Sequence, residues 1–189
     1  MVEGILDYSR LSPHILAIRS LGSGRALADA LTNLETPISE HVATITHDPM
    51  PMVLADQVQM TQLFQNLIGN GIKYCSSRAP TIHVSASLDH DQVTFRIPDN
   101  GIGIHPTDVD RIFEMFTRVQ VSDTIAGSGI GLASCKRIIE RLGGFDPSRV
   151  ESMVGVGATV VVTLRKAPDE PLSPSVGASV RAAGLPEDL

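Results

Sequence analysis

The amino-acid sequence predicts an α/β fold, because amphipathic helices and half-buried strands both occur along a chain of 189 residues. The clearest helix includes residues 62–74, where apolar side chains recur at steps of three and four. The clearest strands are residues 81–88 and 92–97, where apolar and polar residues alternate. A chain of this length can form one domain with a hydrophobic core.

The helix that includes residues 62–74 has two chemically different faces. One face is an apolar stripe that must pack on a sheet or on other helices, formed by Met60, Leu63, Phe64, Leu67, Ile68 and Ile72. Asn66, Asn70 and Lys73 form a polar row on another side. This row is either a solvated helix face or a site for phosphate and metal, since carboxamide oxygens suit magnesium and an ammonium group suits phosphate. The helix alone leaves both interpretations open.

Periodicity, capping residues and turn signals predict the remaining elements. Further helices are expected at residues 1–12, from an N-cap at Ser23 to Pro37, at 106–113 and at 131–142. Further strands are expected at residues 42–46, 52–54, 150–153 and 159–164. Asp56 is the expected N-cap of the central helix. Residues 119–127 are expected to form a loop, and residues 167–189, rich in Pro, Ser, Ala and Gly, a disordered tail.

Composition excludes several classes of protein. Hydrophobic residues make up 42% of the chain, the net charge is −6, and the pI is about 5.4. This acidic balance argues against a nucleic-acid surface, which would need a basic stripe. We expect no membrane segment and no signal peptide, because no apolar run approaches about 18–20 residues. Two cysteines without a dense framework fit a reducing, cytoplasmic compartment.

Four motifs follow one another in the sequence. They are the polar row Asn66–Asn70–Lys73 and the glycine-rich segments 99–103, 127–131 and 155–159. A single glycine pair is most often a turn, so the prediction rests on the combination. The carboxylate of Asp99 can accept from the exocyclic amine of adenine, whereas guanine would present an oxygen there. Segment 127–131 leads into a helix, so its amides can bind phosphates, although it is neither a P-loop nor a dinucleotide fingerprint.

Together, the segments NLIGNGIKY, DNGIGI, IFEMF, GSGIGLA and GVGAT resemble the catalytic ATP-binding domain of sensor histidine kinases. These belong to the gyrase, chaperone, kinase and MutL superfamily, and QLFQNLIGN and THDPMP are most similar to bacteriophytochrome-like kinases. The resemblance covers residues 40–166. It implies a Bergerat fold, which is a two-layer α/β (α+β) sandwich with a mixed, mostly antiparallel sheet and three helices on one face.

The resemblance also implies roles for individual residues. Asn70 would be a ligand of Mg²⁺, while Asn66, Lys73 and Arg118 would act on the transferring phosphate. Phe113 and Phe116 would anchor a mobile ATP lid that runs to Gly127. The residues implied to bind ATP are Asn66, Asn70, Lys73, Tyr74, Asp99, Gly101, Gly103, Ile104, Phe116, Gly127, Gly129, Gly131, Leu132 and Thr159.

The function implied is phosphoryl transfer from ATP with Mg²⁺ to a histidine. Residues 1–12 resemble the end of the family's dimerisation and phosphoacceptor hairpin, and residues 13–39 would be a linker and a helix. The acceptor histidine would come from a missing or partner hairpin, so we expect no self-labelling and a monomer. A response regulator is the expected downstream partner.

Three alternatives remain open. A gyrase- or MutL-type ATPase would need a carboxylate base where Asn66 stands. A non-catalytic nucleotide-binding module and a protein-serine kinase are the others.

Two features depart from the family pattern. Gly71 replaces the usual alanine, at a cost in helix propensity of about 1 kcal/mol. Residues 145–149 contain about two residues more than is usual, which bears on the register of the strand that follows. The histidines show no metal-ligand spacing and are expected at the surface or on strands.

Overall fold

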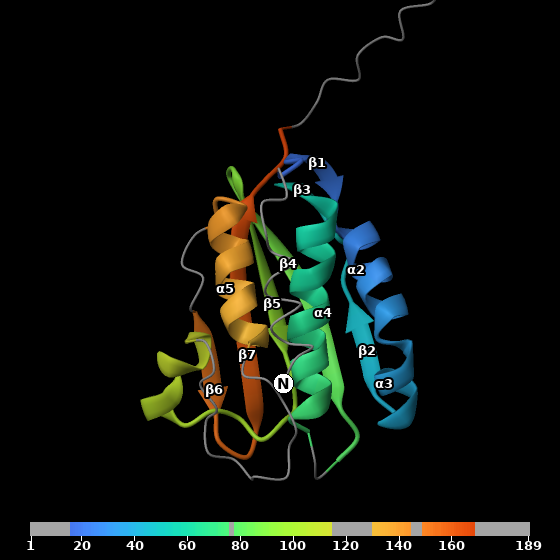
Figure 1. Cartoon of the computed structure of the whole chain (residues 1–189), viewed down its shortest axis with the longest axis vertical. Coiled ribbons are helices and arrows are strands. Elements are labelled where there is room, and N and C mark those ends of the chain that lie inside the picture. The colour runs from blue at the N-terminus through green and yellow to red at the C-terminus, as the bar shows by residue number, and fades with distance from the viewer. Residues whose placement is uncertain (1–15, 76–77, 115–129, 145–148, 169–189) are drawn as a thin grey trace, which may run out of the picture.

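The computed structural model describes residues 16–75, 78–114, 130–144 and 149–168. Within these residues, a five-stranded sheet carries helices on one face (Figure 1). The strands are β2 (Thr44–His47), β4 (Thr81–Asp89), β5 (Gln92–Pro98), β6 (Val150–Met153) and β7 (Gly157–Arg165). Their order is β2-β4-β5-β7-β6, with β2 and β4 parallel and the other neighbours antiparallel. This arrangement confirms the predicted two-layer sandwich with a mixed, mostly antiparallel sheet.

Three helices lie side by side on the sheet: α2 (Ser23–Asn33), α4 (Gln57–Lys73) and α5 (Gly131–Arg141) (Figure 1). The short helix α3 (Glu35–Glu40) follows α2 and contains Pro37. The continuous helix expected at residues 106–113 is instead two single turns of 3₁₀ helix, η1 (Pro106–Asp108) and η2 (Arg111–Phe113). Such turns are usual in short connectors.

The apolar face of α4 forms the middle of the core, as its periodicity predicts. Its six predicted apolar side chains are all buried. The rings of Phe64 on α4 and Phe95 on β5 meet edge to face, with centroids 5.6 Å apart and planes at 88°. This geometry is favourable for aromatic pairs, and it fixes α4 against the centre of the sheet.

Asp56 caps α4, as predicted, and also holds the chain that enters the domain. Its Oδ1 accepts from the backbone N of Gln59 at 3.0 Å, and its Oδ2 accepts from the backbone N of Ala17 at 3.0 Å. The side chain is 4% exposed. One buried carboxylate therefore joins the segment before β1 to the first turn of α4.

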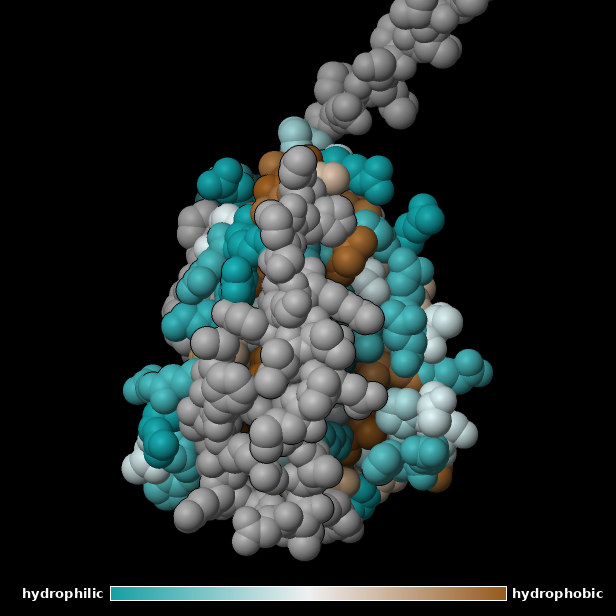
Figure 2. Space-filling model, in the orientation of Figure 1, coloured by the Kyte–Doolittle hydropathy of each residue, from teal (hydrophilic) through white to brown (hydrophobic). Residues whose placement is uncertain are grey.

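A small second sheet lies at the end of the molecule where α4 begins (Figure 1). It pairs β1 (Arg19–Gly22) with β3 (Met52–Ala55) in antiparallel register, and β1 was not predicted. Apolar side chains reach the surface near these strands (Figure 2), where Ile18 and Met52 are about half exposed. The backbone N of Ala167 donates to the Met52 carbonyl at 3.3 Å, and Ala167 is 2% exposed. Ala167 is thus packed, although it was assigned to the tail.

Two local predictions are wrong. The N-cap of α2 is Gly22, because the hydroxyl of Ser23 donates instead to the Pro51 carbonyl at 2.7 Å. Strand β2 begins at Thr44, two residues later than expected, because Val42 has a positive φ of 50° that is incompatible with a strand. The predictions for residues 1–12 and 119–127, and for the tail from residue 169, lie outside the described residues.

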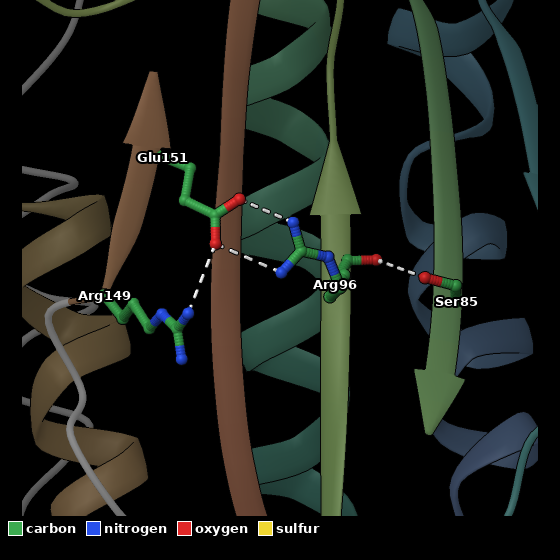
Figure 3. Close-up of polar contacts among 4 residues, drawn as sticks. All are labelled: Ser85, Arg96, Arg149 and Glu151. Atoms are coloured by element: carbon green, nitrogen blue, oxygen red, sulfur yellow. Dashed lines mark hydrogen bonds and ion pairs between the residues drawn. The ribbon is translucent and has the colours of Figure 1, made fainter.

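The face of the sheet opposite the helices carries polar and charged side chains. Figure 3 shows the guanidinium of Arg96 on β5 reaching across β7 to the carboxylate of Glu151 on β6, with Arg149 on the other side of that carboxylate. The Arg96–Glu151 distances are 2.6 and 3.2 Å, which is a two-pronged ion pair. In the part of the chain that the structure describes, no helix combines the length and apolar character needed to cross a bilayer.

Candidate functional site

The C-terminal half of α4 brings two of the predicted motifs together. A Cβ placed on Gly131, the first residue of α5, would lie 3.6 Å from Nδ2 and 3.7 Å from Oδ1 of Asn70. A Cβ placed on Gly71 would lie 3.2 Å from the Cβ of Asp99 and 2.9 Å from Cγ1 of Ile82. Asn70 therefore faces the start of α5, while the next residue touches the loop that holds Asp99. Figure 1 shows this end of α4 beside the start of α5.

The carboxylate of Asp99 is anchored through one of its two oxygens. Oδ1 accepts from the backbone N of Gly101 at 2.8 Å and of Ala158 at 3.2 Å. Among the described residues, no hydrogen bond to Oδ2 occurs, so this oxygen can take a donor from a ligand. Burial raises the pKa of Asp99, and the bonds from the Gly101 and Ala158 amides oppose that rise.

The loop after Asp99 packs closely on its neighbours because glycine occupies two points of close approach, Gly101 in the loop and Gly157 on β7. A Cβ on Gly101 would lie 2.8 Å from the Tyr74 carbonyl oxygen, and a Cβ on Gly157, which has a φ of +148°, would collide with the Asp99 carbonyl. The Ile104 backbone N donates to Ser152 Oγ at 2.7 Å, which ties the end of the loop to β6. Gly103 is buried between these points and has a φ of +72°.

The first turn of α5 offers backbone amides beside Asn70. The N-cap residue Ile130 provides no side-chain hydrogen bond, and the first turn contains no acidic residue. The first N–H groups of a helix lack intrahelical acceptors and carry partial positive charge. Leu132 packs partly buried against the core, which holds this turn in place. The end of α5 can therefore bind an anion next to a neutral oxygen ligand.

Asn66 lies one turn before Asn70 on α4, and its side chain faces the thiol of Cys135 on α5. Complete burial is the main cause that raises the pKa of Cys135, to about 12, and the polar side chain of Asn66 opposes that rise. The thiol is therefore protonated at neutral pH. The two helices run antiparallel here. Asn70 faces Gly131, and Asn66, one turn earlier on α4, faces Cys135, one turn later on α5.

Lys73 and Tyr74 pair with each other at the end of α4. The ammonium nitrogen of Lys73 lies 4.8 Å from the centre of the Tyr74 ring and 3.4 Å from its hydroxyl. Tyr74 is the C-cap residue and is 36% exposed. Its backbone carbonyl accepts from the Ile102 N at 3.0 Å, so the loop after Asp99 is tied directly to this helix end.

Thr159 lies on the opposite side of the sheet from the other candidate residues. It pairs with Pro98 and with Glu151, and it shares its face of β7 with Val161 and Thr163. Side chains alternate between faces along a strand, so the neighbour Ala158 is the residue of β7 that meets Asp99. Here the sequence indicated the correct strand but not the residue.

Several predicted residues lie outside the described part of the chain, namely Phe116, Arg118, Gly127 and Gly129. Of the two phenylalanines expected to anchor a lid, Phe113 is described, is 5% exposed, and lies in η2, which packs against α5. Within the described ranges, no three His, Cys, Asp or Glu side chains gather as metal ligands. The carboxamide oxygen of Asn70 is a hard, neutral group of the kind that Mg²⁺ accepts.

Sequence reasoning missed two residues that support the site, Arg78 and Asn100. Arg78 donates to the Asn100 carbonyl at 2.8 Å and to the Val156 carbonyl at 2.9 Å. The Asn100 side chain accepts from the Thr81 backbone N at 2.8 Å. Asn100 in a D-N-G turn was a detectable signal, because Asn side chains often bond to nearby backbone. An exposed arginine after a helix carries no such signal.

Comparison with known proteins places this geometry in a family. The sequence profile of the histidine kinase-, DNA gyrase B-, and HSP90-like ATPases matches residues 55–168. The chain is 44% identical over 164 residues to cyanobacterial phytochrome A of Nostoc sp. strain PCC 7120, and 39% identical over 114 residues to the sensor protein kinase WalK of Staphylococcus haemolyticus. These matches cover 87% and 58% of this chain, but 21% and 18% of the relatives.

Solved structures have the same fold. Full-length ShkA in complex with AMPPNP superimposes with a TM-score of 0.72 at 25% identity, covering 88% of this chain and 35% of ShkA. The mycobacterial sensor histidine kinase MprB gives a TM-score of 0.67 at 22% identity, covering 80% of this chain and 99% of that structure. The sheet and the three helices therefore form a known fold. The chain belongs to the family of histidine kinase-, DNA gyrase B- and HSP90-like ATPases and is an ATP-binding catalytic domain of the sensor histidine kinase type.

Proposed function

We propose that this domain binds ATP with Mg²⁺ at the C-terminal end of α4 and transfers the terminal phosphoryl group to a histidine on a separate helical hairpin. The observation that carries the proposal is the convergence of Asn70, Asp99 and the start of α5 around one helix end. A neutral oxygen ligand, a base acceptor and a row of free amides are the three groups that a purine triphosphate needs. The bound AMPPNP in the related ShkA structure supports this choice of ligand.

Asp99 is the group proposed to select adenine. Its Oδ1 is held by two backbone amides, so Oδ2 remains available as an acceptor for the exocyclic amine. Guanine places a carbonyl oxygen at that position, which would face the carboxylate without a proton between them. Leaving a buried polar group unpaired in this way discriminates strongly between ligands. Tyr74 borders the same loop and is proposed to contact the base.

The phosphates are proposed to bind at the first turn of α5, beside Asn70 and Lys73. The Oδ1 of Asn70 is a hard, neutral ligand that fits Mg²⁺, and phosphate oxygens and water would complete the coordination. When bound, the metal would neutralise charge on the triphosphate. The helix end alone contributes about 0.3–1 kcal/mol, so Lys73 and the metal must supply the larger share of phosphate binding. Gly127, Gly129, Phe116 and Arg118 are proposed to complete the site.

The reaction proposed is in-line transfer, in which the bond from the γ-phosphorus to the bridging oxygen of ADP breaks and a bond to an imidazole nitrogen forms. Catalysis of this reaction consists mainly of positioning and charge neutralisation. A hydrolytic ATPase would instead need a general base to activate water. Asn66 is a carboxamide, which cannot accept a proton at neutral pH. The absence of a base in its side chain supports transfer over hydrolysis.

A fluorescent ATP analogue, titrated with and without Mg²⁺, tests nucleotide binding. We expect Asn70→Ala to weaken binding by about tenfold in Mg²⁺ and by much less in its absence, because the lost group contacts the metal. Asn33→Ala is the matched control, since Asn33 is an exposed carboxamide on α2 that bonds only to Gln65 among the described residues. Equal loss in both variants, or no Mg²⁺ dependence in the wild type, contradicts the proposed site.

Radioactive ATP tests the transfer step. We expect no label on the isolated chain, and acid-labile label on an added hairpin that contains the phosphoacceptor histidine of a related kinase. Acid-stable label would indicate a serine kinase, and steady phosphate release that is lost in Asn66→Ala would indicate an ATPase. Nucleotide binding without transfer to any such hairpin would indicate a non-catalytic module. A cytoplasmic location and a downstream response regulator belong to the same proposal.

A further inference from the structure

Three segments of the chain meet around the loop that follows Asp99. The first is the chain after α4, whose Tyr74 carbonyl accepts from the Ile102 backbone N at 3.0 Å. The second is the loop itself, and the third is the turn between β6 and β7, where the Gly155 backbone N donates to the Ile102 carbonyl at 2.7 Å. The position of the loop is therefore set by contacts on both sides rather than by its own turn alone.

Arg78 connects the same segments through its guanidinium. Its Nε donates to the Asn100 carbonyl at 2.8 Å, and its Nη2 donates to the carbonyls of Val156 at 2.9 Å and Gly155 at 3.4 Å. All three acceptors are backbone oxygens, on the loop and on the β6–β7 turn. A planar fork with several N–H groups suits this arrangement, and a lysine ammonium would not reproduce it. The side chain is exposed, so it is free of any role in the core.

Asn100, which Arg78 holds by its carbonyl, is also fixed by its side chain. Its Oδ1 accepts from the Thr81 backbone N at 2.8 Å and from the Cys75 thiol at 3.2 Å, and its Nδ2 donates to the Ala79 carbonyl at 3.0 Å. Asn100 lies between Asp99 and Gly101, whose backbone N bonds to Asp99 Oδ1 at 2.8 Å. A rotation of the peptide at Asn100 would therefore move the carboxylate of Asp99.

We propose that Arg78 is a positioning residue that fixes the orientation of the Asp99 carboxylate, and so contributes to the selection of adenine without touching the nucleotide. This inference rests on the proposed adenine site. It assigns a specificity role to a side chain that lies between the end of α4 and β4, outside the four sequence motifs. If Arg78 is lost, the loop and the β6–β7 turn lose this side-chain bridge and keep the backbone bond from Gly155 to Ile102. The partners of Arg78 do not include Asn70 or the first turn of α5, so those groups should keep their positions.

The test compares ligands that use different parts of the site. ATP, GTP and inorganic tripolyphosphate, each with Mg²⁺, compete against a fluorescent ATP analogue on wild type, R78A, R78K and R25A. We expect R78A to weaken ATP binding by about tenfold and to change the affinity for tripolyphosphate by less than about twofold. The ratio of the affinities for ATP and GTP should become smaller. R25A removes the same charge from the exposed surface of α2 and should behave as wild type.

R78K keeps the charge and the alkyl stem but loses the fork, so it guards against a folding defect in R78A. We expect R78K to show the same selective loss of ATP affinity with a wild-type thermal unfolding midpoint. Wild-type ATP affinity in R78A and R78K, or equal losses for ATP and tripolyphosphate, would overturn the role of Arg78. Failure of the proposed function would look different. In that case the wild type would not bind ATP at all, or Asp99→Asn would leave the preference of the protein for ATP over GTP unchanged.

Discussion

At the scale of single residues, the site depends on side chains whose hydrogen bonds leave one group unused. Asp99 directs Oδ1 to two backbone amides and keeps Oδ2 available. Asn100, by contrast, uses both polar atoms of its side chain in bonds to Thr81, Cys75 and Ala79. Asp99 therefore keeps one oxygen for a further donor, whereas the Asn100 side chain is committed to holding the loop in place.

The raised pKa of Asp99 predicts a pH dependence of base binding. Because burial raises this pKa above its ordinary value of 3.8, the carboxylate becomes protonated at a higher pH than an exposed aspartate would. Protonation removes the acceptor, so we expect adenosine affinity to fall as the pH drops through the raised pKa. Calorimetric titration with adenosine measures this without the phosphates, which titrate themselves.

Asp99→Asn is the control for this pH dependence, since it cannot titrate. Its weaker adenosine binding should not change over the same pH range. Wild-type affinity that stays constant down to the pH of an ordinary carboxyl group would show that protonation of Asp99 does not affect adenosine binding.

Both cysteines are predicted to be unreactive in the folded protein. Cys135 is fully buried with its pKa raised to about 12, and the Cys75 thiol is buried and bonded to Asn100. Thiolates, not thiols, react with aromatic disulfide reagents. We expect essentially no thiol release at neutral pH in buffer and two thiols per chain in guanidinium. In guanidinium, the Cys135→Ser variant should release one thiol per chain. Rapid thiol release from the native protein would contradict the burial of these groups.

At the scale of elements, α4 is placed so closely on the sheet that one of its glycines cannot carry a side chain freely. A Cβ at Gly71 would lie 2.9 Å from Cγ1 and 3.0 Å from Cδ1 of Ile82, a fully buried residue of β4. The sequence alone indicated only a cost in helix propensity at this position. The structure adds that the glycine permits the close approach of α4 to β4 and Asp99.

Two glycines on α4 make this point testable as a matched pair. A Cβ at Gly69 would meet only Leu34 Cδ2, at an ordinary 3.5 Å. We expect Gly69→Ala to raise the free energy of unfolding by up to about 1 kcal/mol through helix propensity. Gly71→Ala should lower it by about 1 kcal/mol, because overpacking against Ile82 outweighs the same gain. Denaturant unfolding measures both, and stabilisation by Gly71→Ala would show that Ile82 moves aside at little cost.

Elements with strong local signals could be predicted, and elements that depend on distant partners could not. Asp56 directly precedes a long apolar period, so its role as N-cap was evident and is confirmed. Strand β1 has four residues, of which Leu21 alone is buried, so it has no alternation to detect. It exists because it pairs with β3, about thirty residues later. Ser23 was assigned as a cap from its type, but its hydroxyl serves Pro51 instead.

The difference between local signals and distant partners also explains which residues of the candidate site could be predicted from the sequence. Asn70, Asp99 and Gly131 belong to local motifs, and the structure brings them to one helix end. Arg78 and Ala158 act through backbone groups that are distant in the chain, with the Arg78 bond to Val156 spanning 78 positions. Such contacts follow from the register of β7 and from the β6–β7 turn, neither of which a local pattern determines.

At the scale of the whole molecule, one face of the sheet is covered by helices, and the other is held by polar contacts between strands. The Arg96–Glu151 pair joins β5 to the edge strand β6 across β7 (Figure 3). On the same face, the Thr94 and Thr163 hydroxyls bond at 3.1 Å. The Arg96–Glu151 pair helps to keep β6 in place, and β6 in turn supports the loop after Asp99 through Ser152.

The Arg96–Glu151 pair predicts how stability depends on pH. The hydrogen bond from Arg96 is the main cause that lowers the pKa of Glu151 below its usual 4.5. A lowered pKa contributes stability that is present above the unfolded-state value and is lost as the pH falls through the folded-state value. We therefore expect Glu151→Gln to lower the thermal midpoint near neutral pH. This difference from wild type should shrink as the pH falls below 4.5 and vanish once the pH is below the lowered pKa of Glu151.

Glu140→Gln provides the matched control, because Glu140 is an exposed carboxylate on the outer side of α5. It should leave the thermal midpoint close to that of wild type at every pH. If Glu151→Gln and Glu140→Gln behave alike, the ion pair does not contribute to stability, as is common for exposed pairs.

The carboxylate of Asp56 has a mechanical consequence. It holds the backbone of Ala17 with one oxygen and the first turn of α4 with the other. A force applied to the backbone before β1 would therefore be transmitted to the N-terminus of α4, the helix that carries Asn70 near its other end. The backbone before β1 and the proposed triphosphate site are thus connected by about one helix length, through a single buried carboxylate.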